Sequence, residues 1–419
     1  MDGDFKPANR PAKSLQPALD ERSAKTQTPD KTFKTPEEVA AIDDVVGPAA
    51  LVDTKLDTDP KEPKSPKFNL HWPFQRREWI ISALVIVVCG AIAGFALTHF
   101  DKKPAASAVT VKKSAKKAPP KPTTVASNLS GLQVAPEVNQ RPVTGVMIEN
   151  SLDARPQSGL SDASVVFEAI AEGGITRFLA LYQDTQPGDI GPIRSARPYY
   201  VKWALGFDAG YAHVGGSPQA LADIKALGVR DLDQFANGGS YHRITSRAAP
   251  HNVYTGISNL NALEAAKGYT TSTYTGFARS KKAQPAKVPT AKTIDLNLSG
   301  ALYNAHYDYV AATNSYNRSE GGAPHMDANG NKQISPTVVV AMVVPFAIAS
   351  DGHHSEYQTI GSGQAYVFQD GNVSIGTWAK TNEKAQITFT DAAGKPIFLN
   401  PGQTWLTAVN AAPKVTYAP

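Results

Sequence analysis

One stretch of this chain constrains what it can fold into more than any other: residues 79–100 contain no Asp, Glu, Lys or Arg. A helix rises about 1.5 Å per residue, so a run of this length crosses a hydrocarbon core about 30 Å thick. Arg76 and Arg77 precede the run, and two lysines follow it closely. The alternative is a buried core helix, which is rarely so long or so free of polar residues. We predict a single transmembrane helix that serves as an uncleaved signal anchor.

Charge is spread unevenly along the chain, whose formal net charge is +5. Residues 1–78 hold 13 basic and 14 acidic residues, whereas residues 101–127 hold seven lysines and one aspartate. The rest, 128–419, is balanced with 22 residues of each sign, so we expect no nucleic-acid partner. Positive residues flank both ends of the span, and the positive-inside rule does not decide its orientation. The long segment before the span favours a cytoplasmic N-terminus.

Composition divides the chain into six segments. Residues 1–78 are rich in Pro, Lys, Asp and Thr and bury too little apolar surface to offset the entropy of ordering. The predicted order is a disordered cytoplasmic tail at 1–78, the transmembrane anchor at 79–100, a Lys/Ala/Pro-rich tether at 101–127, a first sub-domain at 128–270, a linker at 271–300 and a second sub-domain at 301–419. Cys89, the only cysteine, lies in the span, which excludes a disulfide framework and a cysteine zinc site.

The first sub-domain carries signals for both strands and helices. Two strands are predicted at 165–172 and 175–183, with Gly173 and Gly174 forming a hairpin turn between them. Three helices follow, each with a serine as its N-cap and a glycine at its end. Their predicted ranges are 196–205 after Ser195, 219–227 after Ser217 and Pro218, and 259–267 after Ser258.

The second sub-domain is predicted to be mainly β. A buried strand is expected at 337–344, and a last strand at 405–409. Two hairpins lie between them, one with strands at 365–369 and 373–378 and one with strands at 386–390 and 395–399. The whole ectodomain is therefore assigned to the α+β class, or to a mixed α/β class, with an α/β first half.

The run Gly-Pro-Ile-Arg-Ser-Ala-Arg-Pro at 191–198 is the strongest candidate for a ligand site. Arg194 and Arg197 would lie at the positive end of the helix predicted after Ser195, where their charges oppose the helix dipole. Free backbone N–H groups and two guanidinium groups suit a phosphate or a carboxylate. The alternative is that both arginines pair with acidic side chains of the fold.

Several other residues are candidates for binding or catalysis. Ser217, which follows a glycine pair and precedes a helix, has an anion-accepting setting. His251 is a candidate general base or ligand, although a hydrogen-bonded structural role is the simpler alternative. In the second half His325 and Asp327 lie two residues apart, but no third ligand accompanies them. We expect no metal site and no cofactor. The remaining candidates are Arg177, Arg243, Arg247, Asn252 and Arg318.

Seven stretches within residues 130–417 resemble the YerB-like family of bacterial envelope proteins. They read IENSLDARPQSGL, FEAIAEGGITRFLALY, GPIRSARPYY, APHNVYT, SYNRSEGGAPHMD, IGSGQAYVFQDGNVSIGTWAK and DAAGKPIFLNPGQTW. The resemblance implies a two-part extracytoplasmic domain, and hence a single-pass protein of the cell membrane with its N-terminus in the cytoplasm. It brings no established reaction. The chain departs from simpler members by a transmembrane anchor in place of a lipid.

Two functions remain open. In the first, the domain binds an anionic cell-wall polymer, a muropeptide or an envelope partner through Arg177, Arg194, Arg197, Arg243 and Arg247. In the second, it is an envelope hydrolase or transferase that acts on a phosphate- or carboxylate-bearing substrate. His251 would then be the base, with Glu168 or Asp327 as an assisting acid. The second function requires His251, Arg194 and Arg197 to meet in one cleft.

Overall fold

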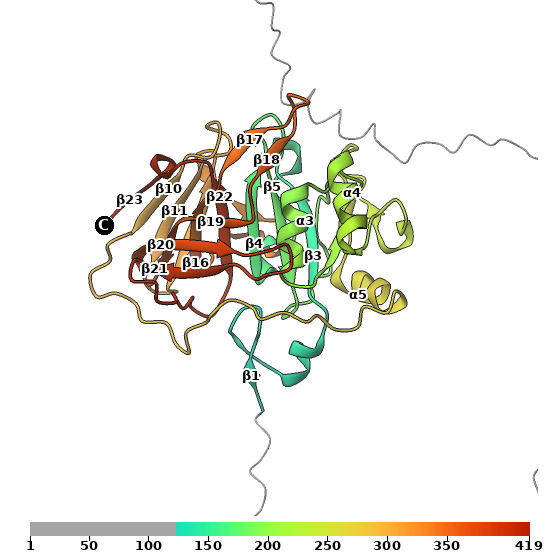
Figure 1. The fold of residues 1–419 in the computed structure, drawn as a ribbon. Helices are drawn as coiled ribbons and strands as arrows, with labels where there is room; N and C mark the ends of the chain where they lie inside the picture. The colour runs from blue at the N-terminus through green and yellow to red at the C-terminus, as the bar shows by residue number, and fades with distance from the viewer. Residues whose placement is uncertain (1–122) are drawn as a thin grey trace, which may run out of the picture. The chain divides into compact units, whose positions relative to one another are not determined.

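The computed structural model describes residues 123–419 (Figure 1). The predicted tail, the predicted span at 79–100 and most of the predicted tether lie outside the described residues. Within residues 123–419, no helix has both the length and the apolar character needed to cross a membrane. The described residues fall within one compact unit.

A ten-stranded mixed sheet runs through both halves of this unit, in the order β21-β20-β19-β16-β22-β4-β5-β3-β6-β7. The two halves meet where β22 pairs in parallel with β4, with Thr404 opposite Val165. The first half supplies β3 (Thr144–Glu149), β4 (Val165–Ile170), β5 (Thr176–Tyr182), β6 (Gly210–Ala212) and β7 (Arg230–Asp231). The second half supplies β16 (Val338–Val343), β19 (Gly361–Gln369), β20 (Asn372–Lys380), β21 (Thr388–Asp391) and β22 (Thr404–Val409).

A smaller antiparallel sheet packs against one face of the large sheet, in the order β13-β12-β11-β10-β23. Its strands are β10 (Thr293–Leu296), β11 (Ala305–Val310), β12 (Ser315–Glu320), β13 (Ala323–Pro324) and β23 (Val415–Ala418). Tyr307 and Tyr316 of this sheet share a hydrophobic core with Trp405 of the large sheet, and all three are fully buried. Two-stranded ribbons complete the β structure: β1 (Val125–Ala126) with β2 (Gln133–Val134), β8 (His242–Arg243) with β9 (Val253–Tyr254), β14 (Met326–Asp327) with β15 (Lys332–Gln333), and β17 (Phe346–Ile348) with β18 (Ser355–Tyr357).

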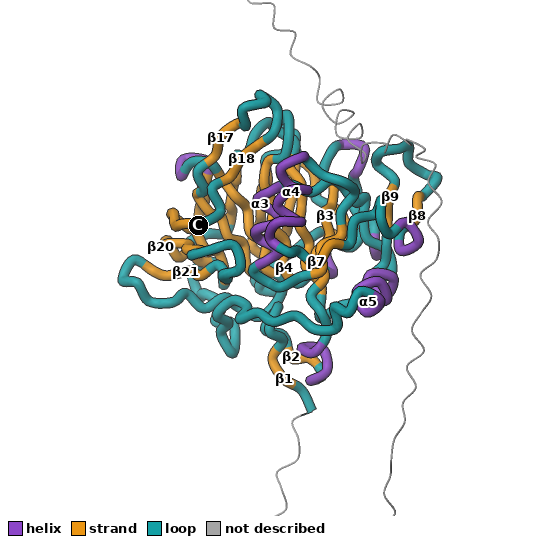
Figure 2. The backbone as a smooth tube through the Cα atoms, turned by 45° about the vertical axis from the view of Figure 1, so that its right-hand side comes forward, coloured by secondary structure: helices purple, strands orange, loops and turns teal. Residues whose placement is uncertain are grey.

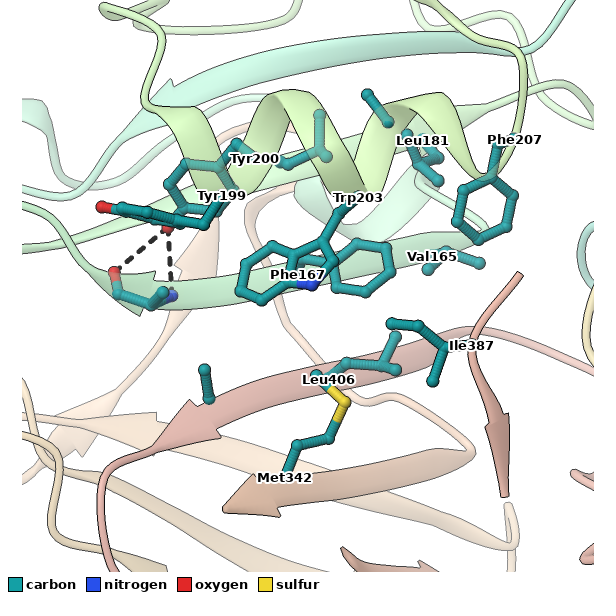
Figure 3. Packing of buried hydrophobic residues seen from close by; sticks show 14 of the residues in the cluster. Val165, Phe167, Leu181, Tyr199, Tyr200, Trp203, Phe207, Met342, Ile387 and Leu406 are labelled. Carbon is teal, nitrogen blue, oxygen red and sulfur yellow. Dashed lines mark hydrogen bonds between the residues drawn. The ribbon is translucent and has the colours of Figure 1, made fainter. Parts of the chain in front are cut away.

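Three α-helices accompany the first half: α3 (Pro198–Leu205), α4 (Pro218–Leu227) and α5 (Ile257–Ala266). In Figure 2, α3 and α4 lie in front of the strands of the large sheet. The indole of Trp203 on α3 stacks on the Phe167 ring of β4, with centroids 5.1 Å apart. Met342 and Leu406 of the second half join the same core (Figure 3). This face of the sheet is therefore a second core to which both halves contribute.

Several predicted elements are confirmed. The strands predicted at 165–172 and 175–183 correspond to β4 and β5, and Gly173 and Gly174 between them have φ of 56° and 82°. Such angles favour glycine, because other side chains clash with the backbone there. Ser217 caps α4 as expected, since its Oγ accepts a hydrogen bond from the Ala220 N–H. The strands predicted at 337–344 and 405–409 correspond to β16 and β22.

Two predicted helix starts are wrong. Helix α3 begins at Pro198, with Arg197 rather than Ser195 as its N-cap. Ala196 is held in extended backbone because it bridges to Gly216, and the helix therefore starts only after it. Helix α5 begins at Ile257 after Gly256, so that Ser258 lies inside its first turn and does not cap it.

Three predictions in the second half are also corrected. The predicted linker 271–300 contains a strand of the smaller sheet, β10. No strand is present at 395–399, because Pro396 lacks the N–H needed for a ladder. Isolated bridges join Pro396 to Thr390 and Leu399 to Arg279. The first predicted hairpin turns on Asp370 and Gly371 alone, because Asn372 already pairs with Gln369.

Glu264 on α5 is a buried acid that makes stability depend on pH. Its Oε2 accepts a hydrogen bond from Thr144 Oγ1 at 2.9 Å, and a Cβ added to Gly210 would collide with its Oε1. Burial raises the pKa of Glu264 from 4.5 to about 8. The folded state therefore binds one proton more than the unfolded state between these values. Stability falls as the pH rises through this window, by about 1.4 kcal/mol per pH unit from this group.

We expect Glu264→Gln to remove this contribution, because a neutral amide has no ionisation penalty. Urea unfolding of the full-length chain between about pH 5 and pH 8 would show a flatter dependence of stability on pH for the variant. Glu137→Gln, which changes an exposed acid, is the matched control. Parallel curves for Glu264→Gln and the unmodified chain would contradict the assignment.

Candidate functional site

Three arginines predicted as ligands converge near the carboxyl end of β3; we call Arg177, Arg194 and Arg197 the arginine cluster. Arg177 lies on β5 directly across from Glu149, the last residue of β3. Arg194 lies on an extended segment whose backbone bonds to β3, because its N–H donates to the Met147 carbonyl. Arg197 is the N-cap of α3. Two stretches of the chain, strand β5 and residues 194–197, thus bring three guanidinium groups to one edge of the sheet.

Two glutamates, which the sequence analysis did not identify, hold the cluster together. Arg177 Nη2 donates to Glu172 Oε2 at 3.1 Å, and Arg197 Nε donates to Glu172 Oε1. Arg177 Nη1 also donates to the Ser195 carbonyl at 2.9 Å. Arg194 Nε lies 3.6 Å from Glu149 Oε1. The predicted alternative, that Arg194 and Arg197 pair with acids of the fold, is therefore present, and Arg177 pairs with an acid in the same way.

His251 joins the same edge through Glu149. Its Nδ1 lies 2.9 Å from Glu149 Oε1, and Ser151 Oγ donates to the same oxygen at 2.9 Å. The other ring nitrogen, Nε2, is 3.9 Å from Asp153 Oδ2, and the His251 side chain is 15% exposed. His251 thus meets Arg194 through Glu149, while Arg197 pairs with a different acid, the neighbouring Glu172.

The protonation states of Glu149 and His251 follow from this contact. Burial opposes ionisation of Glu149, but the hydrogen bond from His251 and the charge of Arg194 outweigh it and leave the pKa of Glu149 below its usual value. The hydrogen bond to Glu149 raises the pKa of His251 despite its partial burial. The pair therefore behaves as a carboxylate that orients an imidazole, an arrangement found in general bases.

The other first-half candidates border this site. Arg243 Nη1 donates to Asn252 Oδ1 at 2.6 Å, so Asn252 braces the loop rather than facing solvent. Arg247 Nη1 and Nη2 donate to the Asp153 and Pro156 carbonyls. We use the term basic edge for the arginine cluster together with Arg243, Arg247 and His251.

The second-half candidates form a different, deeper group. Arg318 Nη2 lies 2.8 and 2.9 Å from the two oxygens of Glu168, and neither side chain is exposed. The guanidinium also lies 4.8 Å from the centroid of the Trp405 ring. Both carboxylate oxygens of Glu168, which was proposed as an assisting acid, are thus bonded to Arg318. Glu168 also accepts a hydrogen bond from Trp405 Nε1 at 2.9 Å.

His325 and Asp327 are held by different partners. Burial and the adjacent Arg318 guanidinium hold the pKa of His325 well below its usual value, so the ring is neutral. Its Nδ1 then accepts from Arg318 Nη1, and its Nε2 donates to Gln157 Oε1 at 2.9 Å. Asp327 accepts from the backbone N–H groups of residues 159, 161 and 329. In the described part of the chain, no group of three or more metal-ligand side chains occurs.

We expect Glu149→Gln to lower the pKa of His251, because the variant removes the carboxylate that accepts its hydrogen bond. The raised pKa of His251 contributes stability that is complete below the unfolded-state pKa and is lost as the pH rises through the folded-state value. NMR titration of 13C-labelled histidines in the full-length chain measures the change. His306, which pairs with Asp295 instead, serves as the internal control. An unchanged or higher pKa of His251 would refute the assigned contact.

Removing Arg318 should destabilise the fold strongly. Arg318→Met leaves the Glu168 charge buried without its partner, and we expect a loss of about 3–5 kcal/mol in chemical unfolding. Adding Glu168→Gln should recover part of it, because the uncompensated charge is then gone. Arg230→Met, which breaks a part-exposed pair with Asp208, should cost about 1 kcal/mol or less. Equal losses at Arg318 and Arg230 would be inconsistent with the buried pair.

Comparisons with known proteins match two regions of the chain. Residues 129–270 match the N-terminal domain, and residues 294–406 the C-terminal domain, of "Protein of unknown function (DUF3048)". "Putative lipoprotein YerB" of Bacillus subtilis (strain 168) is 31% identical over 284 residues, which are 67% of this chain and 85% of that protein. The crystal structure of YerB protein from Bacillus subtilis is similar with a TM-score of 0.64 and 28% identity. The region of similarity covers 70% of this chain and 100% of the solved chain.

Proposed function

The chain belongs to the DUF3048 family, as the YerB-like resemblance indicated, and we propose that its described part is the extracytoplasmic domain of a membrane-associated envelope protein. The relative from Bacillus subtilis carries the name of a lipoprotein, which supports a position outside the cytoplasm and next to a membrane. In this chain the apolar run at 79–100 would replace the lipid, with the folded domain held away from the membrane by the lysine-rich tether.

The proposed activity is binding of an anionic envelope polymer at the basic edge. The observation that carries it is a group of five arginines from three stretches of the chain near the end of β3. Arg177, Arg194 and Arg197 pair with Glu149 and Glu172, whereas Arg243 and Arg247 belong to the loop that leads to His251. Arg243 is exposed and Arg247 is half-buried, so these two side chains form the accessible rim. The arginine cluster is buried, and its three guanidinium groups exceed the two paired carboxylates of Glu149 and Glu172 by one positive charge. Guanidinium groups suit the phosphate or carboxylate groups of such a polymer because they donate two parallel hydrogen bonds.

A pull-down of the full-length chain with isolated cell-envelope polymers tests this function. We expect saturable binding that weakens with added salt, as contacts between exposed charges do. Arg243→Gln combined with Arg247→Gln should weaken binding by roughly tenfold or more, because two charge-assisted contacts are lost. Arg230→Gln, at a part-exposed arginine on β7, is the matched control and should bind normally. Equal binding by the rim variant and the control, both folded, would rule the basic edge out.

A second candidate function is supported by the Glu149–His251 contact. A carboxylate that orients an imidazole, with the second ring nitrogen on the side of solvent, suits a general base acting on a phosphate- or carboxylate-bearing substrate. Ser151 does not fit the role of nucleophile, because it bonds to Glu149 and lies near Nδ1 rather than Nε2. Soluble fragments that accumulate in the same incubation, and are lost in His251→Gln, would favour a hydrolase or transferase over a binding module.

A further inference from the structure

A hollow of about 420 Å³ lies between the β17–β18 ribbon and the helices α3 and α4, apart from the residues of the basic edge. In Figure 1 this ribbon projects at the top of the molecule. The volume is within the range of pockets that hold small organic ligands. None of the candidate residues considered so far lines it.

Three aromatic residues line the hollow: Phe346, which is partly exposed, and Tyr199 and Tyr357, which are 1% and 8% exposed. The Tyr357 ring lies 4.9 Å from that of Tyr199 and 5.1 Å from that of Phe346, measured between centroids. Both tyrosine hydroxyls are tied to β4, because Tyr199 donates to the Ile170 carbonyl and Tyr357 accepts from the Ile170 N–H. The rings are therefore fixed before any ligand arrives, which lowers the entropy cost of binding.

Planar polar side chains line the hollow on two sides. On α4, Gln219 and Asp223 are one turn apart, and Gln219 Nε2 donates to Asp223 Oδ1 at 2.6 Å. On the ribbon side, Glu356 and Gln358 are exposed. Amides donate and accept hydrogen bonds, whereas carboxylates only accept. The rim thus offers both kinds of group at positions where a ligand has access to them.

We propose that this hollow binds one uncharged sugar unit of the polymer that the basic edge holds, an inference that rests on the proposed function for the identity of the polymer. Sugar hydroxyls both donate and accept, which matches amides and carboxylates. The apolar face of a pyranose ring packs on an aromatic ring, and Phe346 is the partly exposed one here. An anionic unit does not match the hollow. Lys202 is the one cationic residue of its lining. Its Nζ lies 3.9 Å from Asp223 Oδ2, and Glu356 adds a second acid to the lining.

The hollow and the basic edge share no residue, but residues of the two sites are adjacent in the chain. Pro198, which lines the hollow, follows Arg197 of the arginine cluster. Glu172, the partner of Arg177 and Arg197, bridges through its backbone to His354, next to Ser355 of the hollow. The arginine cluster itself is buried, so a polymer with its neutral sugar in the hollow would meet the exposed Arg243 and the half-buried Arg247 with its anionic groups.

Titration of the full-length chain with uncharged disaccharides tests the inference without involving the basic edge. The probes are N,N′-diacetylchitobiose and cellobiose, each up to about 10 mM, with trilysine as the cationic alternative. We expect a disaccharide to bind, and Gln219→Ala with Asp223→Ala to weaken it about tenfold or more. Lys225→Ala changes another face of α4 and is the matched control. Binding of one disaccharide but not the other shows whether the acetamido group is recognised.

A variant in which a large side chain fills the hollow provides an independent test. Ala347 lines the hollow from β17 and is exposed, so Ala347→Trp blocks it without removing a polar group and is expected to abolish disaccharide binding. No binding of either disaccharide, or binding unchanged in both hollow variants, would overturn the inference. Trilysine binding that the hollow variants abolish would also overturn it, in favour of a cationic peptide.

Polymer binding at the basic edge and sugar binding in the hollow can be contradicted separately. The rim variant Arg243→Gln, Arg247→Gln should keep normal disaccharide binding while it loses the anionic polymer. If the hollow variants bind the polymer as tightly as the unmodified chain and no disaccharide binds, the proposed function stands and this inference is wrong. If a disaccharide binds in the hollow but the polymer does not bind at all, the proposed function is wrong and the hollow takes a sugar from another source.

Discussion

Two full charges, the Arg318 guanidinium and the Glu168 carboxylate, lie in contact where neither is exposed to solvent. Removing such charges from water costs several kcal/mol for each, and only close pairing with further hydrogen bonds offsets it. Here Glu168 comes from β4 in the first half, and Arg318 comes from β12 in the second. Each half alone would therefore leave one of these charges buried without its partner, or would have to open and hydrate it.

The same contact connects the interior to the surface site. Arg318 bonds to His325, His325 to Gln157, and Gln157 Nε2 donates to the Glu149 carbonyl and to Asn150 Oδ1. Glu149 in turn contacts His251 and Arg194 of the basic edge. Gln157 thus holds the backbone at Glu149, and His325 of the second half in turn holds Gln157. The position of His251 consequently depends on both halves, although it lies in the first.

Local signals in the sequence predicted local structure well. The predictions that α4 starts at Ser217-Pro218 and that a glycine pair forms the turn after β4 were confirmed, because each depends on residues a few positions apart. The start of α3 was not, because a backbone bridge between Ala196 and Gly216 decides it. The arginines of the edge were identified as a group, but their partners were missed. Glu149 ends an apolar run that was not recognised as a strand, and Glu172 was assigned only to the end of a strand.

The parallel pairing of β22 with β4 places Thr404 beside Val165, although most of the described chain separates them in sequence. During synthesis, strand β4 therefore waits for its partner until residues 404–407 have been made. Until then its edge carries unpaired backbone groups and an apolar surface, the features that favour association with other chains. The two halves therefore form one compact unit only after both have been made. Until then, the first half needs protection from association with other chains at the open edge of β4.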